Sequence, residues 1–177
     1  MSTLTYALLG ILAEGPQTGY GLLKHFRGSL NYAWPASHSQ IYPELARLLE
    51  QGLIRQAAKG PRGSKTYEIT DGGLAAVRSW LRDTEPNRSV RSEPLLRIFL
   101  LWLLDPGETA AYLRGELEHL RGLLAELEAL AADRPQTQTA RQRSYGLALE
   151  FGLRETLARI EWAEWALREV SHAASER

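Results

Sequence analysis

Apolar residues recur at helical spacing in three short segments near the N-terminus. These segments are residues 2–13, 19–28 and 39–51. In each of them apolar side chains return at intervals of three and four residues, which is typical of a helix with one buried face. Gly15 ends the first segment, Thr18 can cap the second, and Gly52 stops the third. The pattern predicts three successive helices, with residues 29–36 as an irregular connector between the second and third.

Two short runs that are typical of strands follow the third helix, and the second of them is rich in β-branched and aromatic residues. Residues 53–56 and residues 66–69 are predicted as strands, and the Gly- and Pro-containing segment 59–65 forms the turn between them. A further helix is predicted over residues 72–83. The order helix, helix, helix, strand, turn, strand, helix is that of a winged helix-turn-helix domain, here expected over residues 1–85.

The second half of the chain is predicted to be entirely helical. Residues 93–104 are apolar on most sides, so a helix there must be buried by protein on most sides. A long helix follows to about residue 132, and a last helix covers residues 139–173. The chain is therefore expected to be mainly α with a small β-hairpin wing, and residues 91–177 are expected to form an all-α dimerisation domain.

Both long helices carry an apolar seam at helical spacing, and on the first the steps alternate between four and three residues. The seam residues are Leu113, Leu117, Leu120, Leu124 and Leu127 on the first, and Leu149, Leu153, Leu157, Ile160 and Leu167 on the second. Neither helix can bury its seam alone. The two helices must pair with each other, with a second copy of the chain, or with both.

Composition narrows the class of protein. The 177 residues are 44% hydrophobic and 24% charged, and they include no cysteine, which excludes disulfides and cysteine-based metal sites. The most apolar stretch, residues 95–104, is half the length of about 20 residues that a membrane span needs, and Arg97 interrupts it. The N-terminus lacks the basic segment of a signal peptide. We therefore expect a cytoplasmic protein with no membrane partner.

The formal net charge of zero hides an asymmetry. Residues 1–90 carry ten basic and seven acidic side chains, which gives +3, and residues 91–177 carry eleven and fourteen, which gives −3. Four of the basic side chains lie in residues 55–65, where there is no acid. Such a stretch is either a solvated loop or an anion-binding loop.

The third helix carries the residue types that read DNA. Its N-terminal turn has Ser, His and Gln side chains, which can hydrogen-bond base edges, and Tyr and Arg side chains further along can reach phosphates. We take Glu44 to face outward with them. The alternative is a polar helix end with a capping serine. The candidates here are Ser37, His38, Ser39, Gln40, Tyr42, Pro43 and Arg47.

Two further segments can contact the DNA backbone. Basic side chains at the hairpin tip can neutralise phosphates beside a groove, and the alternative for them is solvation. Tyr20 and Lys24 share one face of the second helix, the helix that crosses the backbone in this motif, although Tyr20 can also pack in the core. The tip candidates are Lys59, Arg62, Ser64 and Lys65.

Aromatic residues are concentrated in the helical half. At helical spacing they usually belong to a core or a dimer seam, and the alternative is a flat pocket for an aromatic effector. The candidates for effector binding are Phe99, Trp102, Trp162 and Trp165.

No pattern of an enzyme is present. The four histidines form no metal-binding pair, no serine lies in a G-x-S-x-G motif, and no G-x-G-x-x-G motif opens a helix after a strand. A single Glu116-x-x-His119 match is too little for a four-helix carboxylate site. We expect no catalytic residue, no metal and no cofactor.

The N-terminal half resembles the PadR family of bacterial transcriptional regulators. The resemblance is carried by Leu8–Leu12, Thr18–Lys24, Ser39–Leu45, Gly52–Ile54 and the Tyr67-x-Ile69-Thr70-x-x-Gly73 pattern. The region from about residue 91 is similar to the longer, virulence-activator type of C-terminal domain in that family.

The resemblance implies a homodimeric repressor of a palindromic DNA operator, relieved by an aromatic small molecule. It also implies that Tyr20, Gln40 and Tyr42 face the DNA. Two other functions stay open from the residues alone: a winged-helix protein–protein interaction module, and a ligand-binding helical protein that does not bind DNA.

Overall fold

The computed structural model describes residues 1–27, 36–59, 65–88, 92–132 and 139–175. The chain divides into two compact units, an N-terminal unit, Met1–Ser89, and a helical unit, Val90–Arg177. Among the described residues, no helix is both long and apolar enough to cross a membrane.

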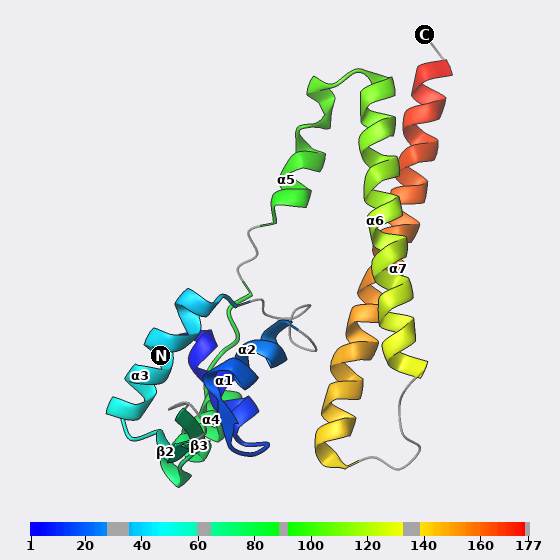
Figure 1. Cartoon of the computed structure of the whole chain (residues 1–177). Coiled ribbons are helices and arrows are strands. Elements are labelled where there is room, and N and C mark those ends of the chain that lie inside the picture. The colour runs from blue at the N-terminus through cyan, green and yellow to red at the C-terminus, as the bar shows by residue number, and fades with distance from the viewer. Residues whose placement is uncertain (28–35, 60–64, 89–91, 133–138, 176–177) are drawn as a thin grey trace. The chain divides into compact units, whose positions relative to one another are not determined.

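The N-terminal unit follows the predicted order of elements (Figure 1). Its elements are α1 (Thr3–Leu12), β1 (Gln17–Thr18), α2 (Gly19–Arg27), α3 (His38–Glu50), β2 (Ile54–Lys59), β3 (Lys65–Ile69) and α4 (Asp71–Asp83). Helices α2 and α3 form the helix-turn-helix, and the β2–β3 hairpin follows them. The predicted helices are confirmed to within a residue or two at each end.

The sheet has one strand more than the sequence predicts. Strand β1 pairs antiparallel with β3, so that Gln17 lies opposite Tyr67 and Thr18 opposite Thr66, and the sheet order is β1-β3-β2. A two-residue strand has no periodicity of its own, so only the tertiary pairing defines it.

Side-chain and backbone caps set the helix boundaries. The Thr18 hydroxyl accepts a hydrogen bond from the Gly21 N–H at 3.0 Å, and the Thr70 hydroxyl accepts one from the Gly73 N–H at 3.1 Å. At the end of α3, Gly52 has a φ of +69°, and the Leu53 N–H donates to the Leu48 carbonyl at 3.0 Å. This is a Schellman motif, which explains the glycine at this position.

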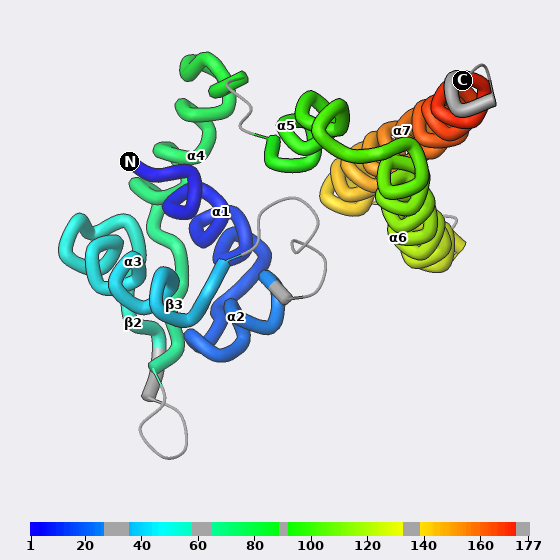
Figure 2. Tube along the Cα trace, turned by 90° about the horizontal axis from the view of Figure 1, so that it is seen from above, coloured from blue at the N-terminus to red at the C-terminus, as the bar shows by residue number. Residues whose placement is uncertain are grey.

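Helix α1 lies at the centre of the N-terminal unit, against α2, α3 and α4 (Figure 2). Its apolar face meets those of α2 and α3, while β2 and β3 each add one buried side chain. The buried apolar residues are Leu8, Leu9, Ile11, Leu12, Leu22, Leu23, Phe26, Ile41, Leu45, Leu48, Ile54 and Tyr67. This core holds α3 with its opposite face toward solvent.

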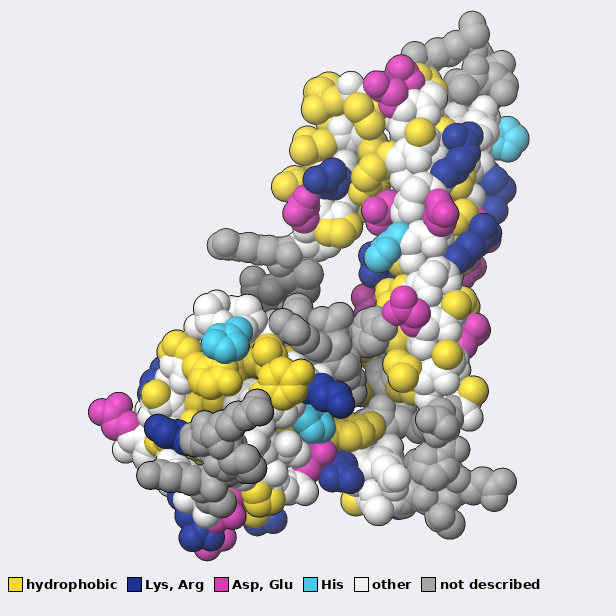
Figure 3. Space-filling view, in the orientation of Figure 1, with side chains coloured by type: hydrophobic (Ala, Val, Ile, Leu, Met, Phe, Trp, Pro, Cys, Tyr) yellow, Lys and Arg dark blue, Asp and Glu magenta, His cyan; other side chains and the backbone are white. Residues whose placement is uncertain are grey.

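The apolar segment of residues 93–104 corrects one prediction. It forms α5 (Glu93–Phe99) and then a 3-10 turn, η2 (Leu101–Leu103), rather than one helix. The backbone leaves the α conformation at Leu100, which has φ −101° and ψ 1°. The apolar side chains are also not buried within this chain, and Figure 3 shows them gathered over α5 and η2.

Helices α6 (Pro106–Ala132) and α7 (Ala140–Ser175) pack along each other as an antiparallel pair (Figure 1). The predicted seam of α6 is confirmed, with Leu113, Leu117, Leu120 and Leu127 buried. On α7, Leu157 is 51% exposed within this chain, while Thr156 is buried.

Small residues of α7 face the leucines of α6. Ala163 clusters with Leu117 and Leu120, and a Cβ on Gly152 would lie 3.6 Å from Leu127. Thr156 fits such a position because its hydroxyl donates to the Gly152 carbonyl of its own helix at 2.8 Å. A pattern search that counts only large apolar residues passes over these positions.

Candidate nucleic-acid interface

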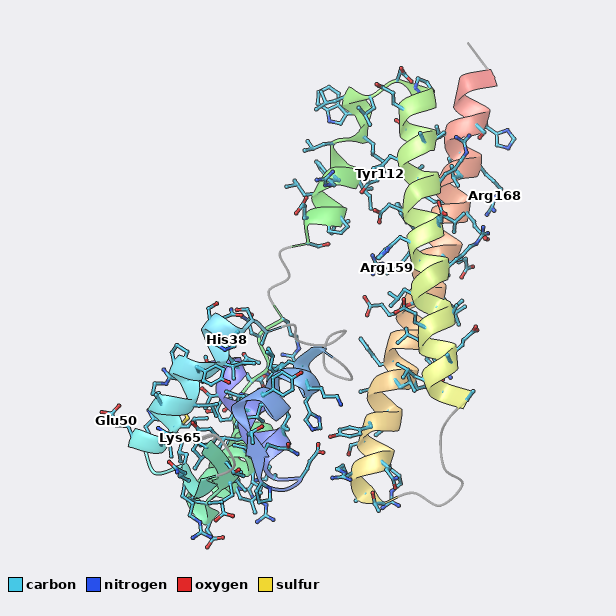
Figure 4. The ribbon with its side chains drawn as sticks, viewed as in Figure 1. His38, Glu50, Lys65, Tyr112, Arg159 and Arg168 are labelled. Carbon is cyan, nitrogen blue, oxygen red and sulfur yellow. The ribbon has the colours of Figure 1, made fainter. Side chains whose placement is uncertain are left out.

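The N-terminal turn of α3 presents polar side chains to solvent. Ser37 is the N-cap, and the Gln40 side-chain oxygen accepts hydrogen bonds from the Ser37 N–H and the Ser37 hydroxyl, both at 2.9 Å. The Ser37 and Ser39 hydroxyl oxygens lie 2.9 Å apart. His38 begins the helix beside them (Figure 4). All four residues are exposed, so this turn can approach another molecule without rearrangement of the core.

The oxygen and the nitrogen of the Gln40 side-chain amide therefore have different roles. Its carbonyl oxygen closes the cap of α3, whereas its amide group keeps two hydrogen-bond donors. Base recognition by Gln40 in this conformation would use the donors.

Pro43 lies in the second turn of α3, which begins at His38. A proline has no N–H to donate to the carbonyl four residues earlier, which here belongs to Ser39. Because Ser39 is exposed, water can satisfy that carbonyl. The proline is tolerated there for that reason.

Tyr42 is held between two neighbours at the junction of α2 and α3. Its ring lies 4.3 Å from the His38 ring, centroid to centroid, and a Cβ on Gly19 would lie 2.9 Å from three of its atoms. Tyr42 nevertheless stays 39% exposed. Burial raises the pKa of the neighbouring Tyr67 phenol, and Tyr42 adds to that rise.

A polar network ties α3 to α1 and corrects one prediction. The Glu44 side chain is only 12% exposed and faces inward, where it accepts hydrogen bonds from Thr5, Ser2 and Arg47. Glu44 was expected to face outward, since helical spacing alone places it at the edge of the apolar face. Thr5, a fully buried hydroxyl on α1, supplies the partner that the pattern does not reveal.

Arg47 belongs to the same network. Its guanidinium lies 2.7 Å from the Glu44 carboxylate and 3.0 Å from the Thr5 hydroxyl. Its interpretation as a phosphate contact stays a prediction, and the side chain already has partners within the protein.

Tyr20 and Lys24 lie exposed on α2. Tyr20 is 72% exposed, so the alternative that it packs in the core is wrong. The two side chains are one helical turn apart and can approach the same partner.

The β2–β3 hairpin pairs two lysines at the end where its two strands are connected. Lys65 begins β3 with its side chain exposed and pairs in register with Lys59, the last residue of β2 (Figure 4). Arg55 forms an ion pair with Glu68 across the hairpin. Arg62 and Ser64 lie outside the described residues, as does the side chain of Lys59.

The four predicted effector residues occupy two kinds of place in the helical unit. Phe99 and Trp102, on α5 and η2, are 80% and 76% exposed. Trp162 is partly buried in the α6–α7 core, and Trp165 is exposed on α7. Among the described residues no ring stacking joins these four side chains.

The helical unit also has a cleft between α5 and α6 that the sequence did not single out. It is lined by Glu93, Pro94, Arg97, Tyr112 and Glu116. The Tyr112 hydroxyl is buried there with no hydrogen-bond partner among the residues that the structure describes, and burial raises its pKa. Arg97 is paired with Glu93 at 2.7 Å.

Comparison with known proteins covers both units. Residues 8–79 match the "Transcriptional regulator PadR-like family", and residues 90–171 match "Virulence activator alpha C-term". The chain is 29% identical to the negative transcriptional regulator PadR of Bacillus subtilis (strain 168) over 173 residues, which cover 93% of this chain and 95% of that protein.

Solved structures of the same relative resemble this fold. The crystal structure of Bacillus subtilis PadR in complex with operator DNA has a TM-score of 0.84 and 28% identity. The crystal structure of that protein in complex with p-coumaric acid has a TM-score of 0.83, also at 28% identity. Both similarities cover 96% of this chain and 99% of the other.

Proposed function

Because the chain belongs to the PadR-like family of transcriptional regulators, we propose that it is a homodimeric repressor of a palindromic operator. The N-terminal unit binds the DNA, and an aromatic small molecule bound by the helical unit releases it. Repression is supported by the similarity to a negative regulator.

The observation that carries the DNA-binding proposal is the exposed polar turn at the start of α3. Recognition helices contact base edges with their N-terminal residues, and here these are Ser37, His38, Ser39 and Gln40. The opposite face of α3 is buried in the core, so the helix is held while this turn stays accessible. A relative of similar fold was crystallised with operator DNA, which supports the same role for this chain.

We propose that residues near that turn contact DNA phosphates. Tyr20 and Lys24 on α2 and Tyr42 and Pro43 on α3 are exposed beside it, and Lys65 is exposed on the hairpin. Tyrosine hydroxyls and lysines are ordinary phosphate partners. Three further contacts are proposed from the sequence alone: Lys59, Arg62 and Ser64.

A second copy of the chain is proposed to cover the apolar face of α5 and η2. Large contiguous apolar surfaces are rare on monomeric soluble proteins, and this one includes seven large side chains. They are Leu95, Leu96, Phe99, Leu100, Trp102, Leu103 and Leu104. Dimerisation through the helical unit would pair two DNA-binding units, as a palindromic operator requires.

The effector is proposed to be a flat aromatic acid of the p-coumaric acid type. The support is a relative crystallised with that compound and the aromatic rings of Phe99 and Trp102, which can stack on such a ligand at the proposed dimer interface. Trp162 and Trp165 are the corresponding candidates on α7.

Fluorescence anisotropy tests the proposal. The probe is labelled DNA from upstream of the protein's own gene, with a scrambled duplex beside it, across a salt series. We expect tight binding to the upstream duplex only, at two chains per duplex. Equal, salt-sensitive binding to both duplexes would leave only electrostatic affinity, and absence of binding at low salt would favour a protein–protein interaction module instead.

A further inference from the structure

Gly19, the first residue of α2, occupies a position where a side chain has no room. It is buried, and an ideal Cβ there would lie 2.9 Å from Cε1, Cζ and Oη of Tyr42. The left-handed region does not explain the glycine, because the positive φ values among the described glycines are those of Gly15 and Gly52. Glycine is therefore required at this position because the Tyr42 ring occupies the space of a side chain, and not because of the backbone conformation.

The Tyr42 ring has little freedom to move away from that position. An aromatic ring is rigid, and the His38 ring lies 4.3 Å from it at a 34° angle. Ile41, which precedes Tyr42 on α3, and Leu45, which follows it, are both buried in the core. A methyl group on Gly19 would have to displace the phenol, since the surrounding helix is held.

The displaced group is one that our proposed function uses. Tyr42 is exposed next to the polar turn of α3, and its hydroxyl lies against Gly19 at the start of α2. The bare backbone of Gly19 thus determines where the Tyr42 hydroxyl is presented.

We propose that Gly19 is a positioning residue for DNA binding, which acts by leaving a seat for the Tyr42 ring between the start of α2 and His38. This inference rests on the proposed DNA-binding function. It assigns a role in recognition to a residue that itself offers DNA no side chain.

The test uses Gly19→Ala with Gly10→Ala as a matched control. Gly10 is also a helical glycine, but nothing lies within 4 Å of a Cβ placed there. Alanine ordinarily stabilises a helix relative to glycine, so neither variant is expected to lower the melting temperature by loss of helix propensity. A loss of DNA affinity without a loss of stability is therefore the signature of positioning.

The first measurement needs no DNA. The imidazole proton resonances of His38, assigned with His38→Asn, report the ring current of Tyr42. We expect Gly19→Ala and Tyr42→Ala to shift them, and Gly10→Ala to leave them unchanged. Unchanged His38 resonances in Gly19→Ala would refute the claim that Gly19 positions the Tyr42 ring, whatever the protein binds.

The second measurement is affinity for the upstream duplex by anisotropy. We expect Gly19→Ala to weaken binding about tenfold, the order of one lost hydrogen bond to a charged group, and Gly10→Ala to bind as the wild type does. In a Tyr42→Ala background, Gly19→Ala should cause no further loss, because no ring remains to be displaced. An equal loss in both backgrounds would overturn the proposal.

Other outcomes separate this inference from the proposed function. Shifted His38 resonances together with wild-type affinity in Gly19→Ala would overturn the role in DNA binding while the protein remained a DNA-binding one. A wild-type protein that binds neither duplex would refute the proposed function itself. If Gly19→Ala folds poorly, recovery of folding in the double variant with Tyr42→Ala would support the seat, and no recovery would contradict it.

Discussion

The guanidinium of Arg47 on α3 lies 3.0 Å from the hydroxyl oxygen of Thr5 on α1, a residue with no exposed surface. Thr5 in turn donates to the Glu44 carboxylate, which also accepts from Arg47 at 2.7 Å. The three side chains form a closed polar link between the central helix of the N-terminal unit and the proposed recognition helix.

Thr5→Val should destabilise the N-terminal unit. The substitution keeps the shape of the side chain but removes a buried hydroxyl with three partners, which are Ser2, Glu44 and Arg47. The Glu44 carboxylate therefore loses a donor in a mostly buried position. We expect a loss of about 1–3 kcal/mol in the free energy of unfolding, measured by urea denaturation. Thr5→Ser, which keeps the hydroxyl and removes only the methyl group, is the control. Unchanged stability in Thr5→Val would contradict the role of the hydroxyl.

Gln40→Glu should separate the capping role of Gln40 from its role toward DNA. A glutamate at this position can still accept from the Ser37 N–H, and a negative charge is favourable at a helix N-terminus. We expect the stability to be kept and operator binding to be lost, because the amide donors are gone and the carboxylate repels phosphates.

Gln40→Ala is the companion variant. It should lose both the cap and about 1–3 kcal/mol of base discrimination, the value of a good side-chain–base contact. An equal loss of affinity on upstream and scrambled duplexes would show that Gln40 does not read sequence.

Lys65→Ala should flatten the salt dependence of DNA binding. Each phosphate contact contributes roughly 0.9 to the slope of log affinity against log salt, and Lys65 is an exposed lysine at the hairpin end. Arg55→Ala is the matched control on the same hairpin, because Arg55 is already paired with Glu68. An unchanged slope in Lys65→Ala would remove this lysine from the interface.

Phe99→Glu should dissociate the proposed homodimer. Phe99 is the most exposed large apolar side chain of α5, and a buried, unpaired carboxylate at a dimer interface costs several kcal/mol. Analytical ultracentrifugation should give the mass of one chain for this variant and of two for the wild type. Leu81→Glu, at an exposed leucine of α4, should leave the dimer intact.

Trp102→Ala should weaken the binding of p-coumaric acid two- to tenfold, which corresponds to the roughly 0.5–1.5 kcal/mol of an aromatic stacking contact. Isothermal titration calorimetry measures this directly. Tyr112→Phe, which removes only the unpartnered hydroxyl in the α5–α6 cleft, is the comparison. A loss in Tyr112→Phe with wild-type affinity in Trp102→Ala would move the effector site into that cleft.

Local signals predicted most of the fold. The boundaries of the helices in the N-terminal unit are set by residues next to them, such as the Thr18 and Thr70 caps and the left-handed Gly52. These boundaries could therefore be predicted from the sequence of this chain alone. Strand β1 and the α7 seam at Thr156 depend on partners far along the chain. A periodicity measured within one segment cannot contain them.

The candidate site divides in the same way. Exposure of the first turn of α3 follows from which face of that helix is apolar, whereas spacing left open whether Tyr20 packs in the core. The inward turn of Glu44 follows from a hydroxyl on α1, and the need for glycine at position 19 follows from a ring on α3. Both are properties of pairs of residues distant in sequence, for which composition and spacing give no sign.

The alternation of large residues on α6 with small ones on α7 has a mechanical consequence. Leu127 lies against Gly152, and Leu117 and Leu120 cluster with Ala163. A larger side chain at Gly152 or Ala163 would meet the opposing leucines and push the two helices apart. The close approach of α6 and α7 along this stretch therefore depends on these two small residues.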